Sequence, residues 1–115
     1  DRTQFTAVFD DLVANSLEAM RSSATPQLVV RVVTTAVAVE IYLSDTGCGL
    51  GLPRSEWDRI FQRRYSTKSP GQGGLGLYNA KLTLLRYQGD VCVHESAPGV
   101  GTSFRITLRQ AKHNA

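Results

Sequence analysis

The sequence predicts an α/β fold: a two-layer sandwich in which a mixed β-sheet is covered on one face by about three helices. Three observations lead to this prediction. Apolar residues recur at helical spacing over residues 3–22. Four runs rich in β-branched residues form two pairs, and a long connection rich in glycine, proline and arginine separates them. The length of 115 residues fits one domain, residues 1–115, with a hydrophobic core of its own.

The first helix is predicted over residues 3–22 and is amphipathic. Its apolar stripe contains Phe5, Val8, Phe9, Leu12, Val13, Leu17 and Met20, and its narrow polar strip contains Asp11, Asn15, Glu18 and Ser22. Residues four apart lie on one face of a helix, so Asp11 and Asn15 are neighbours. A carboxylate beside an amide can hold Mg²⁺ with its waters or position a proton acceptor. The same pattern is also typical of a plain polar face.

Strands are predicted at residues 27–34, 37–45, 90–96 and 101–109. In the second strand, the period of two that places Ile41 and Leu43 on the apolar face also carries Asp45 onto it. A carboxylate directed toward the core needs a hydrogen-bonding partner, because burying it unpaired is costly. In the last strand, Thr102 begins the inward row that continues with Phe104.

Two glycine-rich segments follow strand-like or loop-like sequence. In "DTGCGLGLP", residues 45–53, Gly47, Gly49 and Gly51 allow close approach of the backbone to a flat ligand. Asp45 can accept a hydrogen bond from an exocyclic amine such as that of adenine. A tight turn capped by the aspartate is the structural alternative.

The second segment, "GQGGLGL" at residues 71–77, opens a helix that ends near Gly89. Its backbone N–H groups can meet a phosphate at the helix N-terminus. A flexible hinge with a helix cap is the alternative. The segment is neither a P-loop nor a dinucleotide-binding fingerprint, since no Lys-Ser or Lys-Thr follows the glycines and no strand precedes them. A short helical piece is predicted near residues 54–61.

Charge and cysteine content limit the function classes. The net charge of +3 is too small to indicate nucleic-acid binding. Basic residues do gather after the first glycines, where they form either an anion-binding patch or a solvated loop: Arg54, Arg59, Arg63, Arg64 and Lys68. The two cysteines have no metal-site or disulfide spacing, which favours a reduced, cytosolic compartment. No apolar run is long enough to cross a bilayer, and the abrupt start indicates a piece of a longer protein.

Three elements follow one another along the chain: the helix with Asp11 and Asn15, the strand that ends in Asp45 and its glycines, and the glycine-rich segment that opens a helix. Together, in this order, they resemble the Bergerat-fold (GHKL) ATP-binding domain of histidine kinases, DNA gyrase, Hsp90 chaperones and mismatch-repair ATPases. The resemblance covers about residues 5–109. Its N box is matched by "DDLVANSLEAM", its D-x-G-x-G box by residues 45–49, and its phenylalanine box and lid by "IFQRRYSTKS" at residues 60–69. The G-x-G-L-G-L box is matched from Gly74, and the last hairpin by "SAPGVGTSFRITL". The short hairpin, the "STK" and the length are similar to the catalytic domain of sensor histidine kinases.

The resemblance implies residue roles and two cofactors, ATP and Mg²⁺. Asn15 would ligate the Mg²⁺ on the phosphates, and Asp11 and Asn15 would be the catalytic pair. Adenine would be held by Asp45 and by Thr102, directly or through water, with room made by Gly47 and Gly49. The phosphates would be covered by a lid that contains Lys68, Gly74, Leu75 and Gly76.

The implied function is transfer of the γ-phosphoryl group of Mg-ATP to a histidine on a helical dimerisation domain of the same kinase, which then serves a response regulator. The implied location is the cytoplasm, with the full protein either free or membrane-anchored, and no contact with nucleic acid or membrane by this domain. The alternatives are an anti-sigma-type serine kinase of the same fold and a degenerate docking module. The phosphoacceptor is expected outside the chain, since His94 falls in a strand and His113 near the end.

Several positions depart from the family pattern. Asp11 stands where histidine kinases commonly have Asn and the ATPase branches have Glu, so it is expected to act either as a base or as a second Mg²⁺ contact. Gln72 replaces a common glycine, Arg63 and Arg64 replace a proline and an aromatic residue, and Asp90 replaces a second glycine. These departures concern lid geometry and catalytic strength more than nucleotide binding.

Overall fold

The structure is a computed structural model that describes residues 2–62 and 76–109; of Arg2 only the backbone is described. The elements follow the predicted order with small shifts in their ends. They are α1 (Arg2–Ala19), β1 (Leu28–Thr34), β2 (Ala38–Asp45), the 3₁₀ helix η1 (Arg54–Phe61), α2 (Gly76–Arg86), β3 (Gly89–Ala97) and β4 (Gly101–Arg109).

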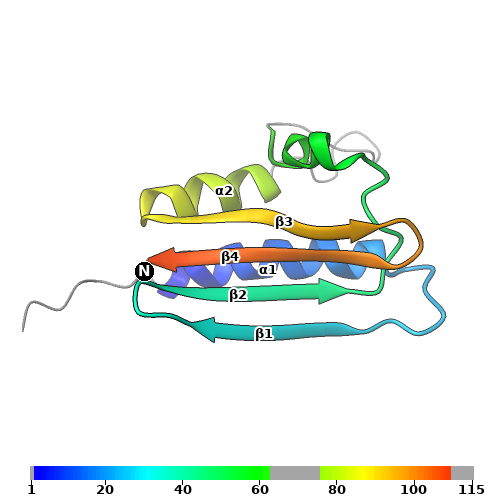
Figure 1. The fold of residues 1–115 in the computed structure, drawn as a ribbon, viewed down its shortest axis with the longest axis horizontal. Helices are drawn as coiled ribbons and strands as arrows, with labels where there is room; N and C mark the ends of the chain where they lie inside the picture. The colour runs from blue at the N-terminus through cyan, green and yellow to red at the C-terminus, as the bar shows by residue number, and fades with distance from the viewer. Residues whose placement is uncertain (1, 63–75, 110–115) are drawn as a thin grey trace, which may run out of the picture.

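The four strands form one sheet in the order β1-β2-β4-β3, and all three neighbouring pairs are antiparallel. The prediction of a mixed sheet is therefore wrong. The chain does enter β3 in the same direction as β2, as a crossover connection requires. The last strand then returns between these two, so the two parallel strands never pair. The sheet consists of two hairpins joined along β2 and β4 (Figure 1).

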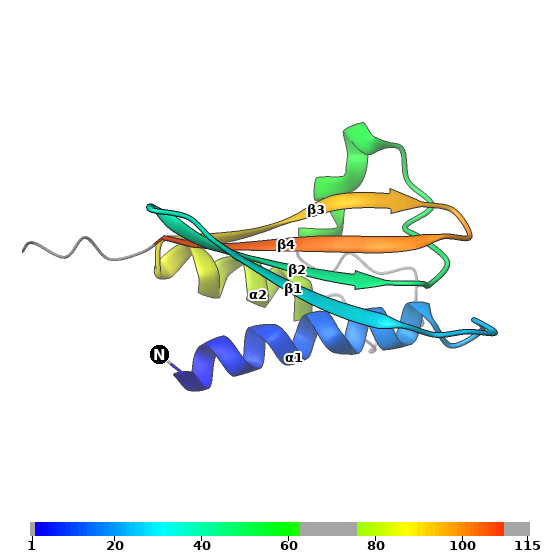
Figure 2. The same ribbon diagram turned by 60° about the horizontal axis from the view of Figure 1, so that its bottom comes forward.

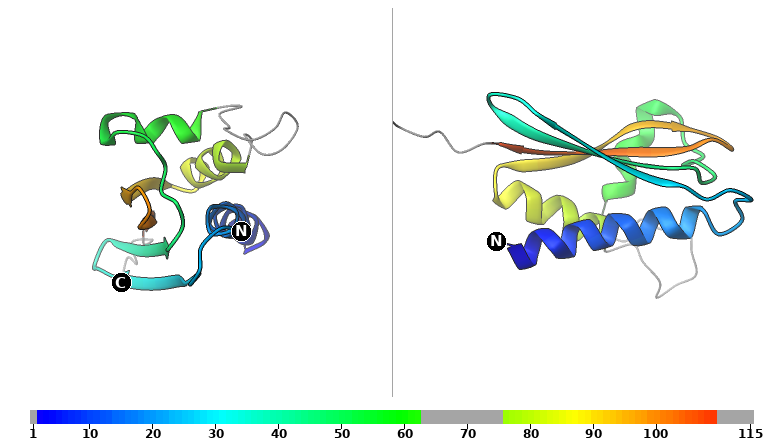
Figure 3. Two further views of the ribbon diagram at one scale, coloured as in Figure 1. Left: turned by 90° about the vertical axis from the view of Figure 1, so that its right-hand side faces the viewer. Right: turned by 90° about the horizontal axis from the view of Figure 1, so that it is seen from below.

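The predicted two-layer α/β arrangement is confirmed. α1 and α2 lie side by side on one face of the sheet, and the opposite face carries no helix among the described residues (Figure 2). η1 lies past the β3 edge rather than over the face, as the end-on view of Figure 3 shows. It still contributes Trp57, Ile60 and Phe61 to the core beneath α2.

The core lies between the helix pair and the sheet, and its largest fully buried apolar side chains are Leu12, Leu43, Phe104, Ile106, Val8 and Val91. These are alternate residues of the strands and helically spaced residues of α1, as the periodicity predicts. Leu17, which was placed in the apolar stripe, is 56% exposed instead. It lies one position beyond Ser16, and it is Ser16 that occupies the inward position between Leu12 and Met20.

Candidate functional site

Asp45 ends β2 on the helix-covered face and is buried, 7% exposed. Its Oδ1 accepts two backbone hydrogen bonds, from Gly47 N–H at 2.8 Å and from Thr102 N–H at 3.1 Å. The predicted partner of this carboxylate is therefore the backbone. Within the described residues no hydrogen bond reaches Oδ2, so one oxygen is fixed by the fold and the other is left as an acceptor.

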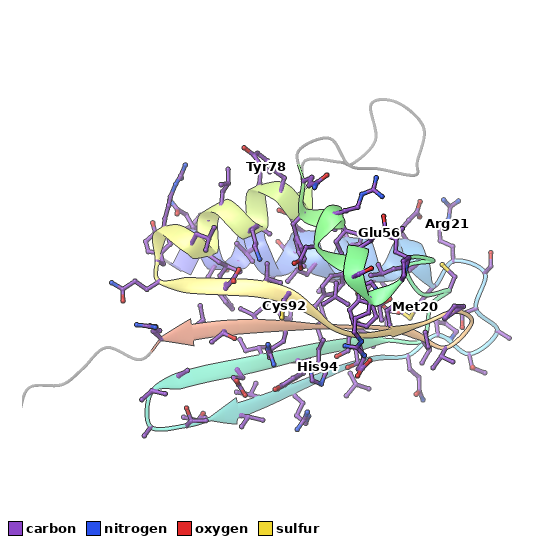
Figure 4. The ribbon with its side chains drawn as sticks, turned by 45° about the horizontal axis from the view of Figure 1, so that its top comes forward. Met20, Arg21, Glu56, Tyr78, Cys92 and His94 are labelled. Carbon is purple, nitrogen blue, oxygen red and sulfur yellow. The ribbon has the colours of Figure 1, made fainter. Side chains whose placement is uncertain are left out.

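The loop after β2 packs tightly against the end of α1. A Cβ on Gly47 would lie 2.7 Å from the carbonyl oxygen of Ala19, which also accepts the backbone N–H of Cys48 at 3.2 Å. The loop thus binds a free carbonyl at the helix C-terminus. Figure 4 shows Met20 at this junction, where its Sδ lies 3.7 Å from Thr46 Oγ1. Glycine at position 47 is required by protein packing, before any ligand is considered.

The same loop also packs against the β3–β4 turn. Gly49 has φ +84°, and a Cβ there would lie 2.6 Å from the carbonyl oxygen of Ala97. In return, Gly99 N–H donates to the carbonyl of Cys48 at 3.0 Å. Residues from three separate parts of the chain therefore meet at the carboxyl end of β2.

Thr102 is buried, 5% exposed, and its hydroxyl belongs to a small network. Thr102 Oγ1 lies 3.0 Å from Ser96 Oγ, and Ser96 Oγ accepts the backbone N–H of Leu50 at 3.0 Å. Ser96 therefore connects the β3–β4 hairpin to the loop after β2. It was not predicted from the sequence, although Ser96 and Thr102 flank the turn "APGVG" symmetrically and pair across it.

Gly101 sets the approach of the last strand to Asp45. Its φ is +142°, and a Cβ at this position would overlap the carbonyl oxygen of Asp45. Only glycine fits here, because both the backbone angle and the space exclude a side chain. The close contact brings the next N–H, that of Thr102, within reach of the Asp45 carboxylate.

Asp11 and Asn15 lie one turn apart on α1 and are both half-buried. Asp11 is adjacent to the first residue of α2, since a Cβ on Gly76 would lie 3.6 Å from Asp11 Cγ. Burial raises the pKa of the Asp11 carboxyl above its ordinary value, and the neighbouring charge of Asp10 raises this pKa further. A carboxyl group of raised pKa is better suited to accept a proton than an exposed aspartate.

Ser16 follows Asn15 and is fully buried, and its Oγ has no hydrogen-bond partner among the described residues. It lies one turn before Ala19, the residue that contacts Gly47. A buried hydroxyl without a partner is uncommon in proteins. Ser16 was missed from the sequence; the available signal was a polar residue at a core-facing position of the helix.

Part of the predicted site lies outside the described residues, namely Lys68, Gly74, Leu75 and the departures Arg63, Arg64 and Gln72. Two members of the basic cluster are described. Arg54 pairs with Glu95 at 2.8 Å and covers the Trp57 ring, and Arg59 pairs with Glu56. Both are therefore engaged in exposed ion pairs on or beside η1.

Cys92 and His94 lie on β3, whereas Cys48 lies in the loop directly after Asp45. His94 is exposed, and its ring centroid lies 5.0 Å from that of Tyr42; Figure 4 labels His94 and Cys92. Cys48 and Cys92 are free thiols. A shallow cavity at the other end of the sheet is lined by Leu85, Gln88, Gly89, Asp90, Thr107 and Arg109. Over the described part of the chain, no group of three or more His, Cys, Asp or Glu side chains is placed to hold a metal ion, and no helix there is long and apolar enough to cross a membrane.

The geometry defines a class of site. It combines a carboxylate held through one oxygen, the buried hydroxyl of Thr102 on the neighbouring strand, and an acid–amide pair on α1. A family profile described as "Histidine kinase-, DNA gyrase B-, and HSP90-like ATPase" matches residues 1–112. The chain belongs to this family of ATPases, and its fold is that of a histidine kinase ATPase domain.

Individual relatives agree with this assignment. The chain is 34% identical over 115 residues to the sensor protein FixL of Bradyrhizobium diazoefficiens, and 29% identical over 116 residues to the sensor histidine kinase DpiB of Escherichia coli K12. Each alignment covers 99% of this chain but only 22% and 21% of the relative, respectively, so the chain spans about a fifth of their length.

Another relative is the sensor protein kinase WalK of Staphylococcus haemolyticus, 30% identical over 113 residues that cover 94% of this chain and 18% of WalK. Among solved structures, the mycobacterial sensor histidine kinase MprB has the same fold, with a TM-score of 0.79 at 22% identity. That match covers 95% of this chain and 74% of the MprB chain.

Proposed function

We propose that this chain is the catalytic ATP-binding domain of a two-component sensor histidine kinase, and that it transfers the γ-phosphoryl group of Mg-ATP to a histidine on a separate dimerisation domain. The observation that carries the proposal is that the two oxygens of the Asp45 carboxylate have different roles. Its Oδ1 is held by two backbone N–H groups, and its Oδ2 is left to accept from the adenine amino group.

The other described residues fit a nucleotide that extends from this point. Thr102 lies next to Asp45 and would hold the ring edge of adenine. Asn15 and Asp11 would hold Mg²⁺ and its waters beside the phosphates. The ion would neutralise charge on the phosphates during transfer. Asp11, with its raised pKa, is placed to act as a base or as a second ligand.

In the proposed reaction, a histidine nitrogen of the dimerisation domain attacks the γ-phosphorus. A P–N bond forms, the bond between the γ-phosphorus and the β–γ bridging oxygen breaks, and ADP leaves. Catalysis of this kind depends mainly on positioning and on charge neutralisation. The predicted lid residues Lys68, Gly74, Leu75 and Gly76 would cover the phosphates, and a response regulator would receive the phosphoryl group later.

The test has two stages. Titration of the chain with a non-hydrolysable ATP analogue and Mg²⁺ should show saturable binding below about 1 mM, a lenient limit for a working nucleotide site. The chain is then mixed with Mg-[γ-³²P]ATP and the histidine-containing helical domain encoded in the same reading frame. Acid-labile, base-stable label on that domain is the expected product.

The rival functions predict different products. A serine kinase of the same fold would place acid-stable phosphate on a protein partner, and a degenerate docking module would not bind the analogue at all. Either result would overturn the histidine kinase proposal. The free Oδ2 of Asp45 favours the nucleotide-binding alternatives over the docking module, because a docking role gives no reason to hold an unpaired carboxylate oxygen in a fixed position at the end of β2.

A further inference from the structure

We propose that Ser96 is a specificity-determining residue of the site: its hydroxyl fixes the direction of the Thr102 hydroxyl and thereby makes the site selective for adenine over purines with the reversed hydrogen-bonding edge. This inference rests on the proposed nucleotide-binding function and adds to it a residue and a mechanism of selection.

The Ser96 hydroxyl lies within hydrogen-bonding distance of two groups. Its Oγ accepts the backbone N–H of Leu50 at 3.0 Å and lies 3.0 Å from Thr102 Oγ1. The distance allows either hydroxyl to be the donor. Within the described residues the Ser96 hydroxyl has no other acceptor, so donation to Thr102 is the arrangement that satisfies its proton inside the protein. Thr102 is then an acceptor toward Ser96.

The Thr102 hydroxyl keeps its own proton for a ligand. Because Thr102 Oγ1 accepts from Ser96, its own O–H is free to donate. Thr102 lies directly beside Asp45, to which its backbone is bonded at 3.1 Å. The site therefore presents an acceptor, Asp45 Oδ2, next to a donor, the Thr102 hydroxyl. Adenine has the complementary pair, a donating 6-amino group next to the acceptor N1.

This arrangement of acceptor and donor discriminates adenine from hypoxanthine and guanine. Hypoxanthine and guanine carry an acceptor at O6 and a donor at N1, which is the reverse of adenine. Bound in the same place, they would direct an acceptor at the Asp45 carboxylate. They would also direct a donor at Thr102, whose hydroxyl has one lone pair already occupied by Ser96 and would have to turn its O–H away to accept with the other. Mispaired polar groups in a buried site reduce affinity strongly.

The experiment measures the affinities of ADP and IDP for the chain by isothermal titration calorimetry with Mg²⁺; the two ligands differ only at this edge, and diphosphates avoid turnover. The parent should prefer ADP at least about tenfold. Ser96→Ala should reduce the ADP/IDP ratio at least about fourfold, and Ser96→Thr should retain it. The matched control is Ser103→Ala, since Ser103 also pairs with a hydroxyl, Ser44 Oγ at 2.9 Å, but on the open face of the sheet.

Two further measurements separate this role from a structural one. In a Thr102→Val background, Ser96→Ala should leave the remaining ADP/IDP ratio unchanged, because Ser96 acts through Thr102. The parent should also bind 1-deaza-ADP, in which C–H replaces N1, about tenfold more weakly than ADP, a result that needs no variant to fold.

Equal losses of ADP and IDP affinity in Ser96→Ala would show that Ser96 only supports the loop, and would overturn the inference. So would a parent that binds ADP and IDP, or ADP and 1-deaza-ADP, equally well, while leaving the proposed function intact. A parent that binds neither ADP nor IDP would instead refute the proposed function itself.

Discussion

The backbone N–H of Thr102 donates to Oδ1 of Asp45 at 3.1 Å and joins two residues that are 57 positions apart in the chain. This bond connects the end of β2 to the start of β4, two strands that lie side by side in the sheet. Because it uses Oδ1, together with Gly47 N–H, it orients the carboxylate without consuming Oδ2. The fold thus holds the acceptor in place before a ligand arrives.

Asp45→Asn should abolish most of the ATP affinity while leaving the fold intact. The asparagine oxygen can still accept from Gly47 and Thr102, so its amide group takes the place of Oδ2 and directs a donor at the donating amine of adenine. We expect binding at least about tenfold weaker, from a lost charge-assisted hydrogen bond. Calorimetric titration checks this, with the exposed Asp58→Asn as the control. Unchanged affinity would mean that adenine does not bind at Asp45.

Gly101→Ala should destabilise the fold by about 2–4 kcal/mol, because the new Cβ would overlap the carbonyl of Asp45 and the φ of +142° is unfavourable for alanine. Gly99→Ala is the matched comparison. Gly99 has φ +72°, but nothing lies within 4 Å of its added Cβ, so only the backbone cost of about 1 kcal/mol applies. Urea unfolding of both variants measures the difference, and equal losses would contradict the close contact at Gly101.

Asn15→Asp should leave the unfolding temperature nearly unchanged and alter the effect of Mg²⁺ on binding of a non-hydrolysable ATP analogue. The parent should bind the analogue more tightly with Mg²⁺ than with EDTA; the variant adds a charge beside the phosphates, so its metal-free binding should be weaker than that of the parent. The exposed Asn79→Asp on α2 makes the same chemical change away from the site. Identical Mg²⁺ dependence in all three proteins would refute the metal role of Asn15.

Asp11→Asn should stabilise the protein near neutral pH. The folded-state pKa of Asp11 is raised by burial and by Asp10, so the unfolded chain ionises first as pH increases from the ordinary value of 3.8. The folded state then loses stability between the two pKa values, and the loss persists at pH 7. An asparagine avoids this loss. The variant should therefore have the higher unfolding temperature at pH 7.

That advantage should shrink as pH falls through the raised pKa and vanish below the ordinary one, where Asp11 is protonated in both states. Thermal unfolding of the parent and the variant from pH 3.5 to 8 measures the profile. An advantage that grows toward low pH would reverse the sign of the pKa shift and contradict the burial of Asp11 against α2.

Much of the fold was predictable because alternation and helical spacing report directly which residues face the core. The inward rows that end in Asp45 and begin at Thr102 follow from a period of two, and both residues are buried as predicted. Strand order is different. Nothing local in the sequence shows that β4 enters between β2 and β3, so the sheet was expected to be mixed. Leu17 is wrongly predicted to face the core because helical spacing does not define which residues at the border of an apolar stripe are buried. Ser16 is missed because a serine does not add to an apolar pattern.

The site was predictable where its chemistry is carried by a motif and unpredictable where it is carried by contacts between segments. The motif around Asp45 and its glycines was recognised, but the reason for glycine at 47 and 49 is contact with the backbones of Ala19 and Ala97. Ser96 carries no motif; its importance comes from bonds to Leu50 and Thr102. The predicted roles of Asn15, Asp45 and Thr102 toward the nucleotide stay predictions.

The position of β4 inside the sheet has a consequence for how the protein acquires its structure during synthesis. The fourth of these strands in chain order, Gly101–Arg109, lies between β2 and β3, so nothing links β3 to the β1–β2 hairpin within the sheet until the ribosome has passed that point. A nascent chain cannot close its sheet gradually from one end. Acquisition of ordered structure, and with it resistance to proteases, is therefore expected as one late event rather than in stages.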